Sequence, residues 1–256
     1  MDVSVILPVY NECNRLESCV RMVNYYLARE FPSYEIIIVE DNSTDNSYEI
    51  AKSIARANER VVLLHNDRRL GRGASLKEAI MESHSDIVMY MDVDLATDIR
   101  YIKRLADSIR GGASLATGSR LMKDSRTERP LSRGIASRSY NAMARLLFRS
   151  RVYDHQCGFK GFNKKDILPL LSVVNDKHWF WDTELIIACQ QQGIKIDEFP
   201  VTWKHNGGNN KNSSKVKILK DSIYMGRRLI GLKIRQHKGG RDIKDPGSDP
   251  GMAGHQ

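Results

Sequence analysis

Long hydrophobic runs are absent from this sequence of 256 residues. No stretch reaches the roughly 18 consecutive apolar residues that a helix needs to cross a bilayer. The sequence begins with a strand-like run, so we expect no secretory signal peptide. We therefore expect a cytoplasmic protein with no membrane-spanning segment.

Cysteine is scarce and scattered. No two of the four cysteines form a Cys-x-x-Cys pair, so nothing in their spacing indicates a zinc site or a disulfide framework. Because the cytosol keeps thiols reduced, we interpret them as packing residues. They are Cys13, Cys19, Cys157 and Cys189.

Net charge is nearly absent from most of the chain and is concentrated near one end. The total is +9, and the segment 215–241 contains nine Lys or Arg and one acid, Asp221, for a net of +8. A basic segment indicates an acidic partner such as membrane headgroups, phosphates or nucleic acid. The sequence has no helix-turn-helix, zinc or stacking-sheet motif, so nucleic-acid binding is a remote alternative and we expect no such partner.

An internal repeat is also missing; instead, short apolar runs alternate with helix-length amphipathic segments. Hydrophobic residues make up 41% and charged residues 28%, which is typical of a globular core in one large domain or two small ones. In the first 110 positions the apolar runs are continuous, as in parallel strands buried on both faces. This βαβα order predicts an open α/β sheet that binds ligands at its carboxyl edge. Strands are predicted at 3–7, 35–39, 61–64 and 87–91, and helices at 15–29, 47–57, 74–83 and 99–110.

The second half is less regular. A polar stretch at 206–214 leads into a long helix at about 215–235, and a tail rich in Gly, Pro and Asp follows, which we expect to be disordered. Further strands are predicted at 114–118, 159–163, 194–199 and 201–204, and further helices at 135–148, 165–171 and 183–192.

Acidic residues follow three of the predicted strands. Glu12 comes after the first strand, Glu40 and Asp41 end the second, and Asp92 and Asp94 follow the fourth. In a parallel sheet these ends share one rim, and such a cluster repels itself unless cations or ligand donors compensate it. Two hard carboxylates one residue apart suit Mg²⁺ or Mn²⁺, which also bind diphosphate oxygens. A solvated turn would explain one Asp-x-Asp, but three acidic ends in register predict a binding crevice.

This set of motifs resembles the family 2 glycosyltransferases of the GT-A fold, over roughly residues 2–235. Within that family it is most similar to the polyprenyl-phosphate hexose synthases, the dolichyl-phosphate glucose and mannose synthases. The glucose-type branch is favoured by the segments 92–97 (DVDLAT), 154–160 (DHQCGFK) and 181–185 (WDTEL). The resemblance implies a Rossmann-like, mostly parallel sheet flanked by helices in a catalytic domain at 1–214. Its nucleotide-binding half covers about 1–118 and its acceptor half about 119–214, followed by a basic amphipathic helix at 215–238 and the tail at 239–256.

For the donor, the resemblance implies that Pro8, Tyr10 and Glu12 border the base and ribose of a nucleotide sugar. Asp41 should accept a hydrogen bond from the base, because a carboxylate matches the imino N–H of uracil or guanine. This hydrogen bond does not distinguish the two bases, so it is the resemblance to the glucose-type branch that makes UDP-glucose the favoured donor and GDP-mannose the next. Arg72, between two glycines at the start of a predicted helix, should approach the diphosphate.

For the metal, the resemblance places Asp92 near the ribose and the ion, with Asp94 as the principal ligand of Mg²⁺ or Mn²⁺. Mannose-type relatives often carry a glutamine two positions after the second aspartate, where this sequence has Ala96. That departure leaves the third protein ligand of the metal open and favours the glucose-type branch.

For the acceptor, the resemblance implies cations around a lipid phosphate. Arg120 resembles an arginine that binds the acceptor phosphate, and Arg133 with Ser137 resembles a second such pair. Lys211 and Lys215 resemble a mobile loop that closes over the diphosphate, although relatives often have arginine at the position of Lys211. Asp94, Arg120 and Arg133 are the residues expected to act in catalysis.

Four more polar residues, Asp154, Gln156, Asp182 and Glu184, are candidates for binding sugar hydroxyls or ordering loops. None is assigned as a base, because a phosphate monoester with a second pKa of about 6 is already ionised at neutral pH. Catalysis would then come from positioning and from stabilising the leaving diphosphate. The resemblance implies direct displacement with inversion at the anomeric carbon.

The long helix predicts where the protein works. Apolar residues recur along it at helical spacing among Lys and Arg, as in helices that lie in a lipid interface. We expect a protein peripheral to the cytoplasmic face of a membrane, or recruited there by a membrane protein partner. A helix packed on the domain with its charges in water is the alternative. Two functional alternatives also stay open: transfer to a glycan or other hydroxyl acceptor, and an inactive relative acting as a scaffold.

Overall fold

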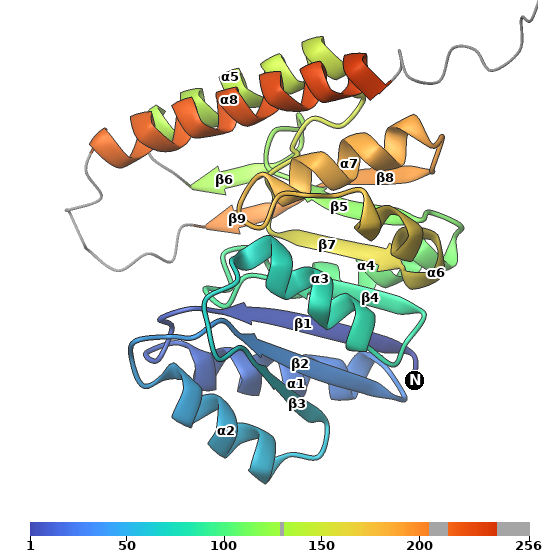
Figure 1. Ribbon diagram of the computed structural model, residues 1–256. Coiled ribbons are helices and arrows are strands. Elements are labelled where there is room, and N and C mark those ends of the chain that lie inside the picture. The colour runs from blue at the N-terminus through green and yellow to red at the C-terminus, as the bar shows by residue number, and fades with distance from the viewer. Residues whose placement is uncertain (129–130, 205–214, 240–256) are drawn as a thin grey trace, which may run out of the picture.

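The computed structural model describes residues 1–128, 131–204 and 215–239. Side chains are described at 1–128, 134–204 and 223–236. A seven-stranded sheet with the order β3-β2-β1-β4-β7-β5-β8 forms the centre of the molecule (Figure 1). Its strands are β1 Val3–Val9, β2 Tyr34–Glu40, β3 Val61–His65, β4 Ile87–Met91, β5 Leu115–Ser119, β7 Phe159–Asn163 and β8 Ile196–Pro200.

Most of this sheet is parallel. β1 pairs with β2 from Val3↔Tyr34 to Val9↔Glu40, and β5 pairs in parallel with β8. β7 is the exception, because it runs antiparallel to both of its neighbours, β4 and β5. The predicted α/β fold with a mostly parallel sheet is confirmed. A second, two-stranded parallel sheet joins β6 Arg126–Glu128 to β9 Thr202–Lys204.

Helices cover both faces of the sheet. The buried residues of β1 and β2 that point to one face of the sheet pack with α1, α2 and α4. On the other face Ile6, Ile37 and Val39 pack with α3, α6 and α7. Burial on both faces explains the continuous Val, Ile and Leu runs of β1 and β2. The helices are α1 Leu16–Glu30, α2 Ser47–Ala57, α3 Arg72–Glu82, α4 Tyr101–Arg110, α5 Leu131–Phe148, α6 Lys164–Ile167, α7 Trp181–Gln191 and α8 Lys215–Gly239.

α5 and α8 form an outer layer that lies side by side beyond α7 (Figure 1). A small apolar cluster joins them to the domain, where Leu229 and Leu232 of α8 pack with Ala144 of α5 and with Phe180 and Ile187. The long C-terminal helix is therefore docked on the domain. No described helix is both long enough and apolar enough to span a membrane.

The structure changes several predicted boundaries. The helix predicted at 165–171 is two pieces, α6 and a 3₁₀-helix at Leu168–Ser172, because Pro169 has no N–H to continue an α-helical ladder. α5 begins at Leu131, not at 135, and α3 begins at Arg72, not at 74. β6 was not predicted, because its short polar sequence Arg-Thr-Glu has no apolar period and depends on pairing with β9.

Candidate active site

A pocket of about 260 Å³ opens at the carboxyl ends of β1, β2 and β4. β2 and β4 flank β1 on opposite sides, so the strand order reverses at β1. Open α/β sheets bind ligands at such a switch point. Residues predicted for donor and metal binding that line this donor pocket are Pro8, Tyr10, Glu12, Asp41, Arg72, Asp92 and Asp94.

Arg72 is held between two carboxylates at the base of the donor pocket. It donates to Asp92 Oδ1 at 2.6 Å and to Asp182 Oδ2 at 3.1 Å. Burial lowers the pKa of Arg72, but the two carboxylates outweigh burial and raise the pKa above its usual value. Asp182 is buried, whereas 44% of the Asp92 side chain is exposed to the pocket. Arg72 therefore remains charged and keeps Asp92 at the pocket surface.

A buried lysine extends this row of charges. Lys160 is fully buried on β7, and its Nζ lies 3.0 Å from Asp182 Oδ1. It also donates to the carbonyl oxygens of His155 and Cys157, so its ammonium has several acceptors. Tyr90 of β4 donates to Asp182 as well, and burial, followed by that carboxylate, raises the pKa of Tyr90. Basic and acidic groups thus alternate from the core to the pocket.

The metal candidates lie at the end of β4. Asp94 Oδ1 accepts from the N–H of Ala96 at 3.0 Å, which orients this carboxylate at the strand end. Burial raises the pKa of Glu12, and the negative charges of Asp94 and Asp92 raise it further against the opposing charge of Arg15. The cluster thus carries negative charge for which a cation would compensate.

Among the described residues, no three His, Cys, Asp or Glu converge closely enough to enclose an ion. Mg²⁺ characteristically binds through one or two carboxylates together with water and substrate phosphates. Asp92 and Asp94 fit a hard divalent cation that takes its remaining ligands from a bound diphosphate.

Asp41 is buried at the end of β2, where both of its oxygens accept backbone hydrogen bonds. The N–H of Leu70 donates to Oδ1 at 2.7 Å and that of Gly71 donates to Oδ2 at 2.9 Å. Asp41 therefore anchors the segment that leads into α3. Gly71 has φ +97°, and a Cβ there would lie 2.5 Å from the carbonyl oxygen of Lys177.

The first turn of α3 is capped by another part of the chain. The N–H groups of Gly73 and Ala74 donate to the carbonyl oxygen of Lys177 at 2.9 and 3.2 Å. The close approach that the glycines permit is thus to residues 177–181, and these two donors already have a partner. Of the predicted segment Gly71-Arg72-Gly73, it is the Arg72 side chain that lines the pocket.

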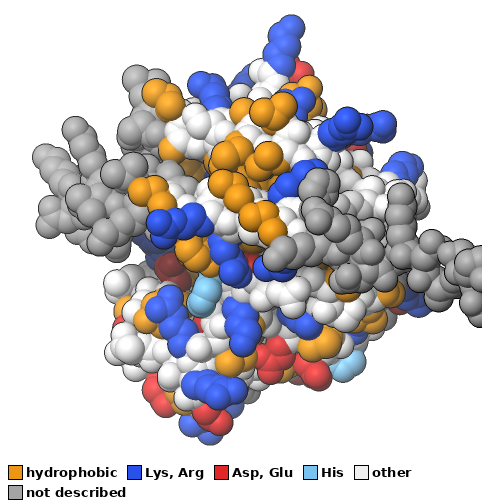
Figure 2. Space-filling view, turned by 45° about the horizontal axis from the view of Figure 1, so that its top comes forward, with side chains coloured by type: hydrophobic (Ala, Val, Ile, Leu, Met, Phe, Trp, Pro, Cys, Tyr) orange, Lys and Arg blue, Asp and Glu red, His pale blue; other side chains and the backbone are white. Residues whose placement is uncertain are grey.

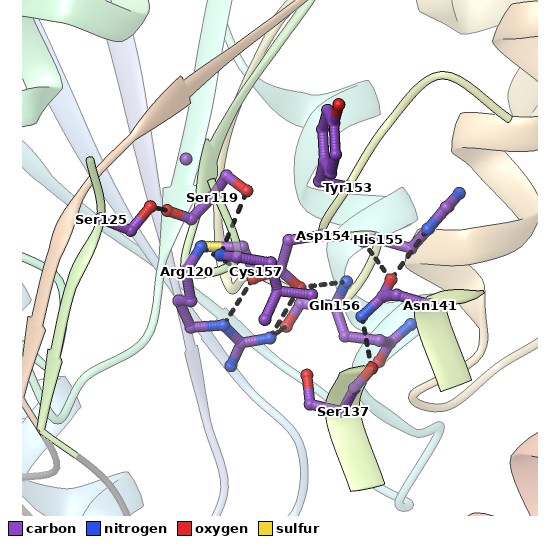
Figure 3. A network of polar contacts seen from close by, with 12 residues as sticks. Ser119, Arg120, Ser125, Ser137, Asn141, Tyr153, Asp154, His155, Gln156 and Cys157 are labelled. Carbon is purple, nitrogen blue, oxygen red and sulfur yellow. Dashed lines mark hydrogen bonds and ion pairs between the residues drawn. The ribbon is translucent and has the colours of Figure 1, made fainter. Parts of the chain in front are cut away.

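A second polar cluster surrounds Arg120, directly after β5 (Figure 3). Arg120 Nε and Nη2 donate to the two oxygens of Asp154 at 2.7 and 2.9 Å, and Nη2 also donates to the carbonyl oxygen of Gln156. Burial opposes ionisation of Asp154, but Arg120 outweighs it and lowers the pKa of Asp154 to about 2. Arg120 and Asp154 thus form a buried bidentate ion pair. We call this pair, together with Ser137, His155 and Gln156 around it, the Arg120 cluster.

His155 lies next to this pair and is also buried. Its Nδ1 is 2.9 Å from Asn141 Oδ1 and its Nε2 is 2.9 Å from Ser150 Oγ. Burial lowers the pKa of His155 to about 4, so the ring is neutral at physiological pH. His155 thereby joins α5 to the segment that follows it.

Ser137 of α5 has an unpartnered hydroxyl. Its Oγ is buried and makes no hydrogen bond to any described atom, whereas its carbonyl oxygen accepts from Asn141. Figure 3 draws the Ser137 hydroxyl on the same side of the cluster as the Arg120 guanidinium. Gln156 donates to Thr183 Oγ1 at 2.8 Å, so its amide links this cluster to α7.

Other predicted acceptor residues fall outside what is described. Lys211 lies outside the described residues, and the side chains of Arg133 and Lys215 are not described. Glu184, a loop or sugar candidate, is buried, and its Oε2 accepts from the N–H groups of Asn175 and Asp176. Glu184 thus holds the segment 175–180, which we call the pocket loop.

The donor pocket and the Arg120 cluster adjoin each other. Asp154 outweighs burial and raises the pKa of Arg120, and the negative charge of Asp92 adds to this rise. A Cβ on Gly158, in the segment between Asp154 and β7, would lie 2.0 Å from Asp92 Oδ2. The missing side chain at Gly158 thus leaves the space in which the Asp92 carboxylate lies.

Several lining residues were not predicted. The guanidinium of Arg69 lies 3.7 Å from the centre of the Tyr10 ring, and the pocket loop contributes His178 and Trp179. The run of basic residues at 68–72 and the aromatic run at 179–181 were visible signals, but their convergence depends on the tertiary fold. Lys160 lay inside a motif used for the resemblance without being assigned a role.

With this geometry in place, comparisons with known proteins agree on one family. The family model described as Glycosyl transferase family 2 matches residues 4–168. Glycosyltransferase AglD of Haloferax volcanii is 40% identical over 233 residues, covering 90% of this chain and 36% of AglD. Dolichyl-phosphate beta-glucosyltransferase ALG5A of Trichomonas vaginalis is 28% identical over 255 residues, covering 94% of this chain and 76% of that protein. The chain therefore spans about a third of the length of AglD.

A solved structure shares the fold. Glucosyl-3-phosphoglycerate synthase from Mycobacterium tuberculosis, in complex with Mn²⁺, uridine diphosphate and glucosyl-3-phosphoglycerate, superposes with a TM-score of 0.65. The two are 17% identical over 90% of this chain and 80% of that chain. The predicted GT-A-like architecture is confirmed.

Proposed function

The chain belongs to glycosyl transferase family 2, and from this premise we propose that it transfers a hexose from a nucleotide sugar to a polyprenyl phosphate such as dolichyl phosphate. Its enzyme class, glycosyltransferase, follows from the family. The observation that carries the proposal is the meeting of three acidic strand ends in one pocket, with Arg72 beside them. The relatives named dolichyl-phosphate beta-glucosyltransferases support dolichyl phosphate as the acceptor and glucose as the hexose. We propose UDP-glucose as the favoured donor and GDP-mannose as the next.

In the donor pocket, Pro8, Tyr10 and Glu12 are proposed to border the base and ribose, with Asp41 facing the base. Asp41 keeps accepting capacity beyond its two backbone bonds, because each carboxylate oxygen has two lone pairs. Arg72 is proposed to lie beside the diphosphate, and Asp92 near the ribose. Asp92 and Asp94 would hold Mg²⁺ or Mn²⁺, which when bound supplies positive charge for the leaving diphosphate.

The acceptor is proposed to enter from the side of the Arg120 cluster. Arg120 and the unpartnered Ser137 hydroxyl would receive the lipid phosphate, assisted by Arg133, Lys211 and Lys215. Since the phosphate is already ionised, with a second pKa of about 6, the chain needs no base to activate it. Direct displacement with inversion then requires positioning in line with the leaving group.

Three acids that could otherwise act as bases already have basic partners. Asp154 pairs with Arg120, Asp182 with Lys160 and Arg72, and Glu184 with Arg235. This pairing favours a phosphate acceptor over a hydroxyl acceptor, which would need a carboxylate positioned as a base. We propose that these acids order the site, and that Gln156 joins its acceptor side to α7.

The outer layer is proposed to meet the membrane on its cytoplasmic face. Figure 2 shows hydrophobic side chains gathered among Lys and Arg on the face that carries α5 and α8. A helix with exposed apolar and basic residues gains from burial in the interface and from attraction to anionic lipid. The exposed apolar residues are Ile135 and Leu146 of α5 and Ile223, Ile230 and Ile234 of α8.

This division of labour gives the proposed domain organisation. The donor half covers about 1–118, the acceptor half about 119–214, and the helix at 215–238 serves membrane attachment, on its own or with a membrane protein partner. The tail predicted to be disordered lies, from residue 240 onward, outside the described residues.

A transfer assay tests the proposal. Purified chain is incubated with Mg²⁺ or Mn²⁺, a short-chain polyprenyl phosphate and labelled UDP-glucose or GDP-mannose, and label entering the organic phase is counted. We expect metal-dependent labelling of the lipid from one donor, with a matched polyprenyl alcohol unlabelled. Donor hydrolysis without lipid labelling would contradict the acceptor, and labelling of the alcohol would support the hydroxyl alternative.

A further inference from the structure

Trp179 is a large aromatic side chain left exposed at the edge of the donor pocket. It lines the pocket, yet 60% of its surface is accessible, and the Arg72 guanidinium lies 5.2 Å from the centre of its ring. A ligand that covered this indole would bury apolar surface, which is favourable. A hexose ring has an apolar face of C–H groups and a rim of hydroxyls, so one flat indole beside a guanidinium suits both parts of a sugar.

The pocket loop that carries Trp179 is tied down at several backbone positions. Asn175 and Asp176 donate their N–H groups to Glu184 Oε2 at 2.9 and 2.7 Å, and His178 donates its N–H to Asp176 Oδ1 at 2.8 Å. The residues that donate these hydrogen bonds directly precede Trp179 in the sequence. The position of the indole thus depends on two buried carboxylates, those of Asp176 and Glu184.

Both carboxylates are neutralised by α8. Arg228 Nε donates to Asp176 Oδ2 at 2.7 Å, and Tyr224 donates to the same oxygen at 3.3 Å. Arg235, two turns further along α8, donates to Glu184 Oε1 at 2.7 Å. A buried carboxylate that loses its basic partner is strongly unfavourable, so the loop keeps this shape while α8 is seated.

We propose that Trp179 contacts the hexose of the bound donor, and that Arg228 and Arg235 of α8 are the positioning residues that hold it over the donor pocket. This inference rests on the proposed function and deepens it. It gives the outer helix a second role besides meeting the membrane, because two of its basic side chains face inward to the pocket loop.

A purely structural role for these ion pairs makes a different prediction. If Arg228 and Arg235 did no more than fasten α8, their loss would lower stability and weaken binding of any ligand equally. The proposal requires an effect specific to the sugar, because Trp179 would touch the hexose and leave the nucleotide contacts of β1 and β2 unchanged.

The test compares the affinity of a nucleoside diphosphate with that of its hexose conjugate, by titration calorimetry with Mn²⁺ and without lipid. UDP with UDP-glucose, and GDP with GDP-mannose, are measured on the full chain. For Trp179→Ala we expect unchanged diphosphate affinity and a loss of about 3- to 10-fold for the conjugate, as for the loss of one aromatic contact. Arg228→Met should lower conjugate affinity in the same way. The double variant Trp179→Ala with Arg228→Met should lose little more conjugate affinity than either single variant.

Arg227→Met is the matched control. Arg227 is the exposed neighbour on the same helix, and it makes no ion pair or hydrogen bond with any described residue. Its removal should leave both affinities unchanged. If Arg228→Met does not fold, Arg228→Lys replaces it, with Arg227→Lys as control, since lysine cannot form the same two-nitrogen contact.

Several outcomes would overturn the inference. Trp179→Ala could weaken both ligands equally or neither, Arg228 variants could match the Arg227 controls, or the double variant could show fully additive losses. Failure of the proposed function looks different, because the unaltered chain would then bind neither conjugate in the presence of metal.

Discussion

The donor pocket and the Arg120 cluster adjoin at the carboxyl edge of one sheet, yet they expose their charges to very different degrees. Asp92 has 44% of its side chain exposed, whereas Asp154 has none. Burial and the two acids at the end of β4 raise the pKa of Glu12, whereas Arg120 outweighs burial and lowers that of Asp154. The first region is arranged to receive a compensating charge from a ligand. The second pairs its charges within the chain, so substitutions there should lower the free energy of unfolding as well as transfer.

The largest effect is expected at the end of β4. Asp94→Asn should lower transfer by about 1,000-fold or more, because it removes the principal proposed metal ligand and with it stabilisation of the leaving diphosphate. The free energy of unfolding should stay within about 0.5 kcal/mol, as for a partly exposed polar change. Asp107→Asn on α4 is the control for loss of one carboxylate. Unchanged transfer by Asp94→Asn would contradict the assignment of Asp94 as the principal metal ligand.

The next effect is expected at Arg120, where substitution should cost stability as well as transfer. Arg120→Met leaves the buried Asp154 carboxylate unpaired and should lower the free energy of unfolding by about 3 kcal/mol, measured by chemical denaturation. Arg104→Met is the matched control, because Arg104 forms an Arg–Asp pair with Asp197 that is largely exposed. That change should cost below about 1 kcal/mol. Equal losses for the two variants would contradict the contrast between the regions.

Acidification should also act on the Arg120 cluster. Burial lowers the pKa of His155 to about 4 in the folded chain, against about 6.5 when unfolded. Between these values the unfolded chain binds one more proton, so the free energy of unfolding should fall by about 3 kcal/mol as the pH falls from about 6.5 to about 4. Denaturation at several pH values measures this slope. His155→Gln should flatten it, and an unchanged slope in that variant would contradict the prediction.

A smaller effect is expected at Asp41, which anchors the segment before α3 and is also the proposed partner of the base. Asp41→Asn replaces one carboxylate oxygen with an NH2 group, which cannot accept the N–H of Leu70 or of Gly71 that this oxygen bound, and it alters the proposed partner of the base. Nucleotide affinity should fall about 5- to 10-fold, roughly 1 kcal/mol. Asp67→Asn, an exposed change in the following loop, is the control in the same titration. Undiminished affinity in Asp41→Asn would show that Asp41 only anchors the loop.

The donor side was predictable because its signals are local. The continuous apolar runs of β1, β2 and β4 predicted parallel strands, and acids directly after them had to share one edge of the sheet. Strands 87–91 and 159–163 have the predicted bounds as β4 and β7. The antiparallel direction of β7 was not readable from its sequence, because a buried strand has the same pattern in either direction.

The buried partners were not predictable in the same way. Lys160 reads as a surface residue until β7 places it next to Asp182, and Arg228 reads as part of a basic helix face until α8 docks on the domain. In each case the partner lies more than 20 positions away, and periodicity within one element says nothing about which side chain of another element it meets. The Arg228–Asp176 and Arg235–Glu184 contacts therefore emerge only from the tertiary structure.

The place of α8 in the chain has a consequence for synthesis. Translation up to Lys204 produces the described residues that line the donor pocket, but the two arginines that pair with Asp176 and Glu184 come later. A nascent chain halted at that point would retain two buried carboxylates beside the pocket loop without their basic partners. Ribosomes stalled at successive positions should therefore yield chains that acquire sugar-selective donor affinity abruptly, once Arg228 and Arg235 have left the exit tunnel.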